Sequence, residues 1–208
     1  MIKFLNCKID LSKKVFEPRI ETEYWVKRAI RELQIADCKL QILDIFAGSG
    51  CIGIAVLKNV KNSFVDFVDI SKESIEQIKI NLKLNGIKKG SYRLLRSNLF
   101  KKVKGKYDFI FANPPYVALE RINEVQKEVL EKEPKIALFA GKDGLDLIRK
   151  FLPRAKKHLK KGGKIFMEFD PKQKVEIEKI LKKENFNFQF KKDQFKKYRW
   201  LVAWRKNY

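Results

Sequence analysis

The sequence contains few of the residues from which disulfide frameworks and metal centres are built. Three cysteines occur in 208 residues, none of them in a Cys-x-x-Cys spacing, and there is a single histidine. An odd and scattered set of cysteines argues against both a disulfide framework and a zinc site. We therefore expect no bound metal, and a reducing, cytoplasmic location.

Long apolar runs and flexible linkers are also missing. No apolar stretch reaches the ~18 residues that a membrane-spanning helix requires, and the longest candidate, 42–57, contains Asp44 and three glycines. Asp10 comes before any apolar core of signal-peptide length develops. These absences exclude secreted, membrane-spanning and fibrous classes. We expect an N-terminal extension with a first helix over 1–38, followed by a single globular domain over 39–208.

Basic side chains greatly outnumber acidic ones, 47 to 25, which gives a formal net charge of +22. Residues 150–208 alone contain 19 basic and 6 acidic side chains. Such a surface suits a partner that carries phosphates, such as a ribosome or RNA. Lysines outnumber arginines 37 to 10, however, and arginine is the usual reader of nucleic acid. A lysine-rich composition on an ordinary surface explains the charge equally well.

Strand-like apolar runs alternate with helical patterns along the chain. The runs lie at 40–45, 64–68, 92–95, 107–112, 164–169, 186–191 and 199–204. The helical patterns lie at 19–36, 51–58, 71–84, 144–159 and 172–184. This alternation predicts an α/β protein in which helices cover both faces of a mostly parallel sheet. The last two strands follow each other directly, which predicts one antiparallel strand.

Several local signals set the expected boundaries of these elements. Thr22 is expected to cap the first helix, and Ser71 the helix that follows the second strand. Gly162 and Gly163 are expected to stop the helix before them. Residues 113–142 form a long connection.

Ligands of such sheets bind beyond the carboxyl ends of the strands. The polar residues that end or follow the predicted strands there are Asp44, Asp69, Asn98, Asn113 and Glu168. We therefore expect the site at this edge.

A glycine-rich loop, Asp-Ile-Phe-Ala-Gly-Ser-Gly at 44–50, follows the first strand of the sheet. Glycines let the backbone turn sharply and approach a ligand closely. Asp69 can accept hydrogen bonds from both hydroxyls of a ribose, and Asp44 can bind an ammonium group. With Gly53 the loop also satisfies the dinucleotide fingerprint G-x-G-x-x-G, so an NAD enzyme is an alternative. An adenosyl group that carries an amino acid fits better, because no histidine ends a strand to serve hydride transfer.

The strand at 107–112 runs into Asn113-Pro114-Pro115-Tyr116. Prolines fix the backbone and lack an N–H. The Asn113 side-chain oxygen and the Pro114 carbonyl can each accept one N–H of a planar amino group, and the Tyr116 ring can lie along that group. Such a clamp favours a tetrahedral nitrogen in the transition state. The four residues therefore predict methyl transfer from S-adenosylmethionine to an amide or aromatic amine.

These motifs resemble those of the HemK/PrmC family of protein N5-glutamine methyltransferases. The segments that carry the resemblance are 18–23, 44–50, 68–69, 97–100, 113–116, 133–134, 137–138, 141–145 and 168–173. The resemblance implies a class I S-adenosylmethionine-dependent methyltransferase fold, Rossmann-like, with seven strands and an antiparallel last strand. Members usually carry a helical domain before this unit. We therefore expect a catalytic domain without that helical domain.

The resemblance also implies which residues bind which ligand. It implies catalysis by residues 113–116, which would hold the substrate glutamine. It places S-adenosylmethionine on Phe46, Ala47, Gly48, Ser49, Gly50, Asp69, Asn98, Leu99 and Asn113. Asn98 stands where the family usually has aspartate.

The implied substrate and partner is a peptide chain release factor, methylated at the glutamine of its Gly-Gly-Gln motif. Methylation of adenine N6 or guanine N2 in a nucleic acid would use the same clamp and stays open. So does a non-catalytic nucleic-acid-binding module.

Overall fold

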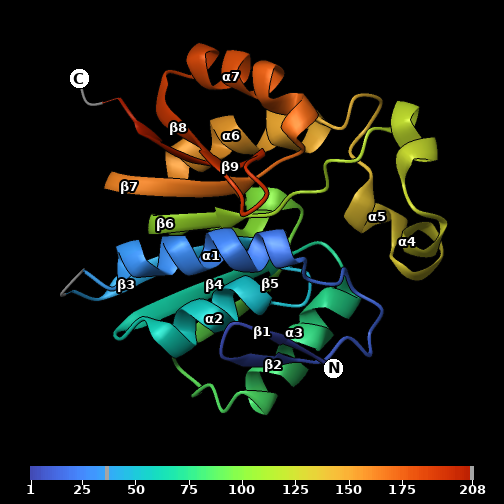
Figure 1. Ribbon diagram of the computed structural model, residues 1–208. Coiled ribbons are helices and arrows are strands. Elements are labelled where there is room, and N and C mark those ends of the chain that lie inside the picture. The colour runs from blue at the N-terminus through green and yellow to red at the C-terminus, as the bar shows by residue number, and fades with distance from the viewer. Residues whose placement is uncertain (36–37, 207–208) are drawn as a thin grey trace.

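A seven-stranded sheet forms the centre of the computed structural model, which describes residues 1–35 and 38–206 (Figure 1). Its strands lie in the order β5-β4-β3-β6-β7-β9-β8. Their bounds are β3 Leu40–Ile45, β4 Ser63–Asp69, β5 Tyr92–Arg96, β6 Tyr107–Ala112, β7 Leu159–Glu168, β8 Phe186–Lys192 and β9 Tyr198–Arg205. Strands β3 to β7 are parallel, and β9 is antiparallel to both of its neighbours. The predicted mostly parallel sheet with an antiparallel last strand is confirmed.

Helices cover both faces of this sheet, as predicted (Figure 1). Helices α1 (Ile20–Leu33), α2 (Cys51–Asn59) and α3 (Lys72–Leu84) pack on one face, and α6 (Asp146–His158) and α7 (Lys174–Lys183) on the other. The alternation of β6 shows why two faces form. Phe109 and Phe111 point toward α1, whereas Ile110 and Ala112 join the cluster under α6, because successive side chains of a strand point to opposite faces.

Helix α1 begins earlier than its predicted cap. Arg19 is the N-cap, and Thr22 lies inside the first turn, where its hydroxyl donates to Glu168 and caps nothing. The expectation that Thr22 caps the helix is therefore wrong. Trp25 holds the helix on the sheet, with its ring 6.1 Å from that of Phe111 and 6.0 Å from that of Trp200, centroid to centroid.

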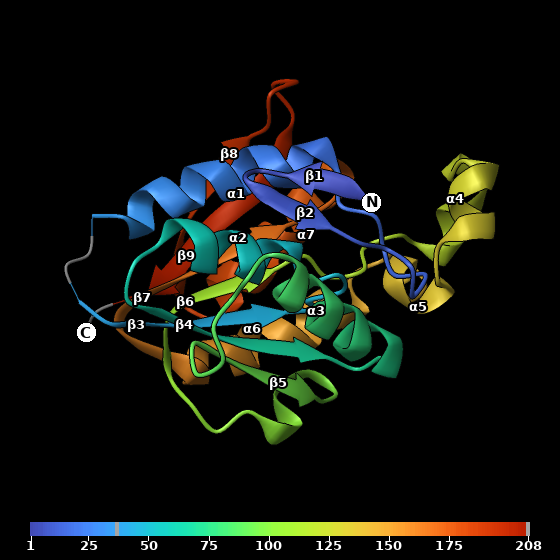
Figure 2. The ribbon, with the colours of Figure 1, turned by 90° about the horizontal axis from the view of Figure 1, so that it is seen from below.

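An N-terminal hairpin, β1 (Ile2–Phe4) and β2 (Cys7–Ile9), was not expected, because each strand has only three residues. Figure 2 shows it beside α2 and α3. Asn81 of α3 fixes the chain just after the hairpin: its Oδ1 accepts from the Asp10 N–H at 2.8 Å. Its Nδ2 donates to the Ser49 carbonyl at 2.9 Å. The N-terminal segment is thereby tied to the glycine loop.

The long connection at 113–142 contains η2 (Leu119–Glu124), α4 (Lys127–Lys132) and α5 (Lys135–Leu138). Figures 1 and 2 both show α4 and α5 as a projection beside the sheet. Its two ends meet, since the Val117 N–H donates to the Leu138 carbonyl at 2.9 Å.

The predicted stop at Gly162-Gly163 is wrong. Helix α6 ends at His158, and both glycines lie inside β7. In the part of the chain that the structure describes, no helix combines the length and apolarity needed to cross a membrane.

Candidate active site

A cavity of about 1300 Å³ opens at the carboxyl edge of the parallel strands. The glycine loop, the ends of β4 and β5, and residues 113–116 line it, together with the segment before α1 and the connection after β6. Ligand pockets commonly measure roughly 300–1,000 Å³, so there is room for a cofactor and a substrate side chain together. Among the residues expected to bind the cofactor, all but Asp44 and Gly50 line the cavity.

The glycine loop turns through a run of left-handed residues. Phe46, Gly48 and Gly50 have φ values of 62°, 53° and 77°. A Cβ on Gly50 would lie 2.9 Å from the side chain of Ile78, whereas one on Gly48 would meet nothing within 4 Å. Gly50 is therefore required for packing against α3, and Gly48 leaves open space beside the backbone.

Asp69, at the end of β4, links this loop to the next helix. Its Oδ2 accepts from the Gly48 N–H and its Oδ1 from the Ser71 N–H, both at 2.9 Å. Burial raises the pKa of Asp69, and these hydrogen bonds oppose the rise. Because each carboxylate oxygen has further acceptor capacity, the side chain can also receive hydroxyls from the cavity.

Asp44 lies behind the loop. Its side chain is 1% exposed, its Oδ2 accepts from the Gly53 N–H at 2.9 Å, and its buried Oδ1 has no partner among the described residues. Burial raises the pKa of Asp44 to about 8. Direct contact between Asp44 and an ammonium group stays a prediction; the contact that the structure contains is with the first turn of α2.

Asn98 and Leu99 follow β5 and line the cavity from the side of η1 (Leu99–Lys102). Asn98 is exposed, and Leu99 is buried with a φ of 50°. The Ser97 N–H donates to the Asp69 carbonyl at 2.8 Å, so the two strand ends form one continuous wall.

The loop after β6 is held at its first residue by two buried side chains. Asn113 Nδ2 donates to Thr22 Oγ1 at 3.4 Å, and Thr22 Oγ1 donates to Glu168 Oε2 at 2.7 Å. Trp25 Nε1 also donates to Glu168 Oε2, at 2.7 Å. Glu168 ends β7, as its sequence predicts, whereas Thr22 is predicted only as a helix cap. The Thr22–Asn113 hydrogen bond spans 91 positions and the Thr22–Glu168 hydrogen bond spans 146, so no local pattern reveals either of them.

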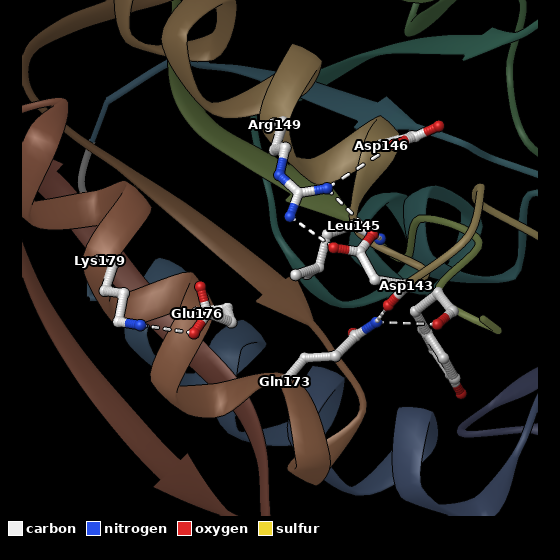
Figure 3. Close-up of polar contacts among 8 residues, drawn as sticks. Asp143, Leu145, Asp146, Arg149, Gln173, Glu176 and Lys179 are labelled. Carbon is white, nitrogen blue, oxygen red and sulfur yellow. Dashed lines mark hydrogen bonds and ion pairs between the residues drawn. The ribbon is translucent and has the colours of Figure 1, made fainter. Parts of the chain in front are cut away.

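The same loop is held at its fourth residue from the other side. Gln173, which ends η3 (Pro171–Gln173), donates through Nε2 to the Tyr116 carbonyl at 2.9 Å and to the Asp143 carbonyl at 3.2 Å. Figure 3 shows Gln173 reaching toward Asp143, whose carboxylate pairs with Arg149. That pairing lowers the pKa of Asp143. Burial raises the pKa of Tyr116, so its phenol stays neutral.

An ion pair between Arg19 and Glu133 crosses from the segment before α1 to the projecting connection. The Arg19 guanidinium also lies over the Phe16 ring, 4.8 Å from its centroid. Both flanking segments line the cavity, so this pair joins two of its walls. In the described residues, no group of three or more His, Cys, Asp or Glu side chains is placed to hold a metal ion.

Comparison with known proteins extends this geometry. A family model described as "Methyltransferase small domain" matches residues 29–142. The chain is 34% identical to the release factor glutamine methyltransferase of Streptococcus pneumoniae over 202 residues, which cover 96% of this chain and 71% of that protein. The chain belongs to the release factor glutamine methyltransferase family. The family member from Thermodesulfovibrio yellowstonii is 36% identical, over 88% of this chain and 66% of that protein.

Solved structures show the same fold. The ribosomal protein L11 methylase of Lactobacillus delbrueckii subsp. bulgaricus superposes with a TM-score of 0.67 at 24% identity, over 93% of this chain and 82% of that one. A methyltransferase from Pyrococcus furiosus superposes with a TM-score of 0.65 at 18% identity, over 96% of this chain and 88% of that one. The predicted class I, Rossmann-like methyltransferase fold is confirmed.

As a member of this family, the chain is an enzyme that uses S-adenosylmethionine as its methyl donor. The cavity fits that cofactor on three observations. Gly48 leaves open space, Asp69 presents carboxylate oxygens with acceptor capacity to spare, and the volume exceeds what one ligand fills. When bound, S-adenosylmethionine supplies an electrophilic methyl group.

Proposed function

We propose that this protein methylates N5 of a glutamine side chain, namely the glutamine of the Gly-Gly-Gln motif in peptide chain release factors. The names of the relatives support this substrate. The carrying observation is the orientation of the Asn113 carboxamide. Its Nδ2 is engaged by Thr22, which leaves Oδ1 as the acceptor that a substrate NH₂ group requires.

The chain's own residues account for the reactivity of an unreactive amide. Asn113 Oδ1 and the Pro114 carbonyl each accept one N–H of the glutamine NH₂ group. Drawn toward two acceptors, the nitrogen loses conjugation with its carbonyl and its lone pair becomes available, an effect that grows toward the transition state. The neutral ring of Tyr116 lies along the amide and limits its orientations. Alignment with the methyl donor supplies much of the remaining rate enhancement.

The test is product analysis with labelled S-adenosylmethionine and three acceptors: a whole release factor, a Gly-Gly-Gln peptide and total RNA. We expect N5-methylglutamine in the release factor, and its loss in Asn113→Ala. Asn123→Ala is the matched control, because Asn123 is exposed on η2 and outside the cavity lining. Labelled RNA beside an unlabelled release factor would replace this substrate with a nucleic-acid amine.

We further propose that basic side chains around the cavity contact RNA when the enzyme meets its substrate near a ribosome, in the cytoplasm. Lys101, Lys150 and Arg154 are exposed and line the cavity, and the described cysteines are free thiols, as a reducing compartment allows. RNA affinity should then fall steeply with salt. Salt-independent or absent RNA binding would remove this part of the proposal.

A further inference from the structure

Thr22 occupies an unusual place in this chain. It is the only threonine in the sequence, and its side chain is 1% exposed. Its hydroxyl lies between the carboxylate of Glu168 and Asn113, the first residue of the loop at 113–116, here called the substrate loop. Asn113 and Glu168 follow or end the neighbouring parallel strands β6 and β7, in which Ala112 pairs with Met167. Thr22 reaches them from α1, on the opposite end of the chain.

The hydrogen bonds in this group have only one consistent direction when Oε2 of Glu168 carries no proton. Burial raises the pKa of Glu168, and the hydrogen bonds from Trp25 and Thr22 oppose the rise. The Trp25 N–H can only donate, so Oε2 is an acceptor. A carboxylate can only accept, and a threonine hydroxyl has a single hydrogen to donate. Glu168 therefore takes that hydrogen, at 2.7 Å. Thr22 Oγ1 can then only accept from Asn113, so the NH₂ end of the carboxamide must face Thr22. The oxygen of Asn113 is left on the side away from Thr22.

Burying the carboxyl group of Glu168 at this position is energetically unfavourable. It is 1% exposed, and a buried carboxylate is unfavourable unless its partners are well placed. Its named partners are the Thr22 hydroxyl and the Trp25 indole N–H, both on one oxygen. An apolar side chain of similar size would serve packing against α1 at least as well. A carboxyl oxygen that accepts, unlike an apolar group, fixes the direction in which the Thr22 hydroxyl donates its hydrogen.

We propose that Thr22 and Glu168 are positioning residues which orient the Asn113 carboxamide so that its oxygen, and not its NH₂ group, meets the substrate nitrogen. This inference rests on the proposed function, because a reversed carboxamide would present hydrogen-bond donors to an NH₂ group that also donates. Neither residue is needed to touch the substrate: both act through Asn113.

Kinetics of Thr22→Val provide the first test, with Thr22→Ser as the conservative variant. Valine keeps the branched shape and removes the hydroxyl, so kcat should fall roughly 2- to 12-fold, the factor expected for one lost hydrogen bond. The KM and calorimetric Kd for S-adenosylmethionine should stay at wild-type values. Thr22→Ser should keep kcat within about twofold of wild type. Wild-type kcat in Thr22→Val, or equal losses in both variants, would overturn the proposal.

Glu168→Gln, alone and combined with Thr22→Val, gives a second kinetic measurement. If both residues act through one hydrogen bond, the double variant should lose no more activity than the worse single variant, since coupled residues are not additive. Fully multiplicative losses would show two independent effects and contradict the proposal. Stoichiometric binding of S-adenosylmethionine in each variant checks that it is folded.

A third readout needs no methyl acceptor. The side-chain NH₂ signals of Asn113 can be assigned in ¹⁵N-labelled protein as the pair that disappears in Asn113→Ala. In Thr22→Val this pair should shift and exchange with solvent faster, whereas Thr22→Ser should leave it close to wild type. Unchanged signals in Thr22→Val would refute the orientation. Wild-type enzyme that methylates no glutamine would instead refute the proposed substrate, so the two failures are distinguishable.

Discussion

Gly144 provides the sharpest test of how the substrate loop is held. Its φ is +76°, and a Cβ at this position would lie 2.2 Å from the carbonyl oxygen of Tyr116 and 2.6 Å from Nε2 of Gln173. Both distances are far inside van der Waals contact, and one of the two atoms is backbone. Gly144→Ala must therefore displace the end of the Asn-Pro-Pro-Tyr loop, the Gln173 hydrogen bond, or both.

The expected size follows from two separate contributions. A left-handed conformation costs an alanine about 1–2 kcal/mol, and overpacking by one methyl group costs about 1–3 kcal/mol. Gly144→Ala should thus lose about 2–5 kcal/mol of unfolding free energy. At roughly 2–4 °C per kcal/mol for a chain of this size, Tm falls by about 4–20 °C. A loop displaced by about 1 Å also lowers kcat by up to about 100-fold.

Gly86→Ala is the matched control for this measurement. Gly86 has a φ of +63°, and a Cβ there would meet nothing within 4 Å, so only the conformational contribution of about 1–2 kcal/mol applies. Thermal unfolding followed by circular dichroism gives both losses, and release-factor methylation at 25 °C gives kcat. Equal losses of Tm in the two variants, or a wild-type kcat in Gly144→Ala, would refute the reasoning.

Three further predictions concern the cofactor wall and the core. Asp69→Asn should weaken S-adenosylmethionine binding about tenfold or more, since it removes a charged partner of the Gly48 N–H; calorimetry measures the change, and an unaltered Kd would contradict the assigned role. The raised pKa of Asp44, about 8 against an ordinary 3.8, means that the folded protein holds a proton which the unfolded chain releases. Stability should therefore fall as pH rises from about 4 to about 8 and level off above. Urea unfolding of Asp44→Asn at several pH values should show an unfolding free energy that no longer falls over this pH range. An unchanged pH dependence would mean that another group causes it. Tyr107→Phe should cost about 1–2 kcal/mol in urea unfolding, because the phenol donates to buried Asp66 at 2.6 Å; a neutral result would count against that bond.

The strand ends could be predicted because each is a local pattern. The apolar runs that precede Asp69 and Asn113, and the turn chemistry that follows them, lie within a few residues of each other. The parallel arrangement then brings such ends to one edge. The Asn-Pro-Pro-Tyr segment could be given a chemistry from its own atoms, because proline removes donors and asparagine adds an acceptor.

The supports of that segment could not be predicted from local patterns. Thr22 is a residue type that commonly caps helices, but its hydroxyl instead donates to Glu168, 146 positions away. Gln173 contacts Tyr116 across 57 positions. Gly162 looked like a helix stop because glycine usually breaks a helix, yet the chain had already left α6 and paired β7 with β6. In all three cases a contact with a residue far along the chain determines the local structure, and a local sequence pattern does not contain that information.

The substrate loop draws its supports from opposite ends of the polypeptide: Thr22 from the first helix, and Gln173 from beyond β7. A growing chain that has just completed Tyr116 contains all four residues of the Asn-Pro-Pro-Tyr loop, but Glu168 and Gln173, which help to hold this loop, have not yet been synthesised. The loop can therefore be held in place only after synthesis has passed Gln173. An abbreviated product limited to the matched family segment, 29–142, would carry the glycine loop and the clamp sequence without either anchor.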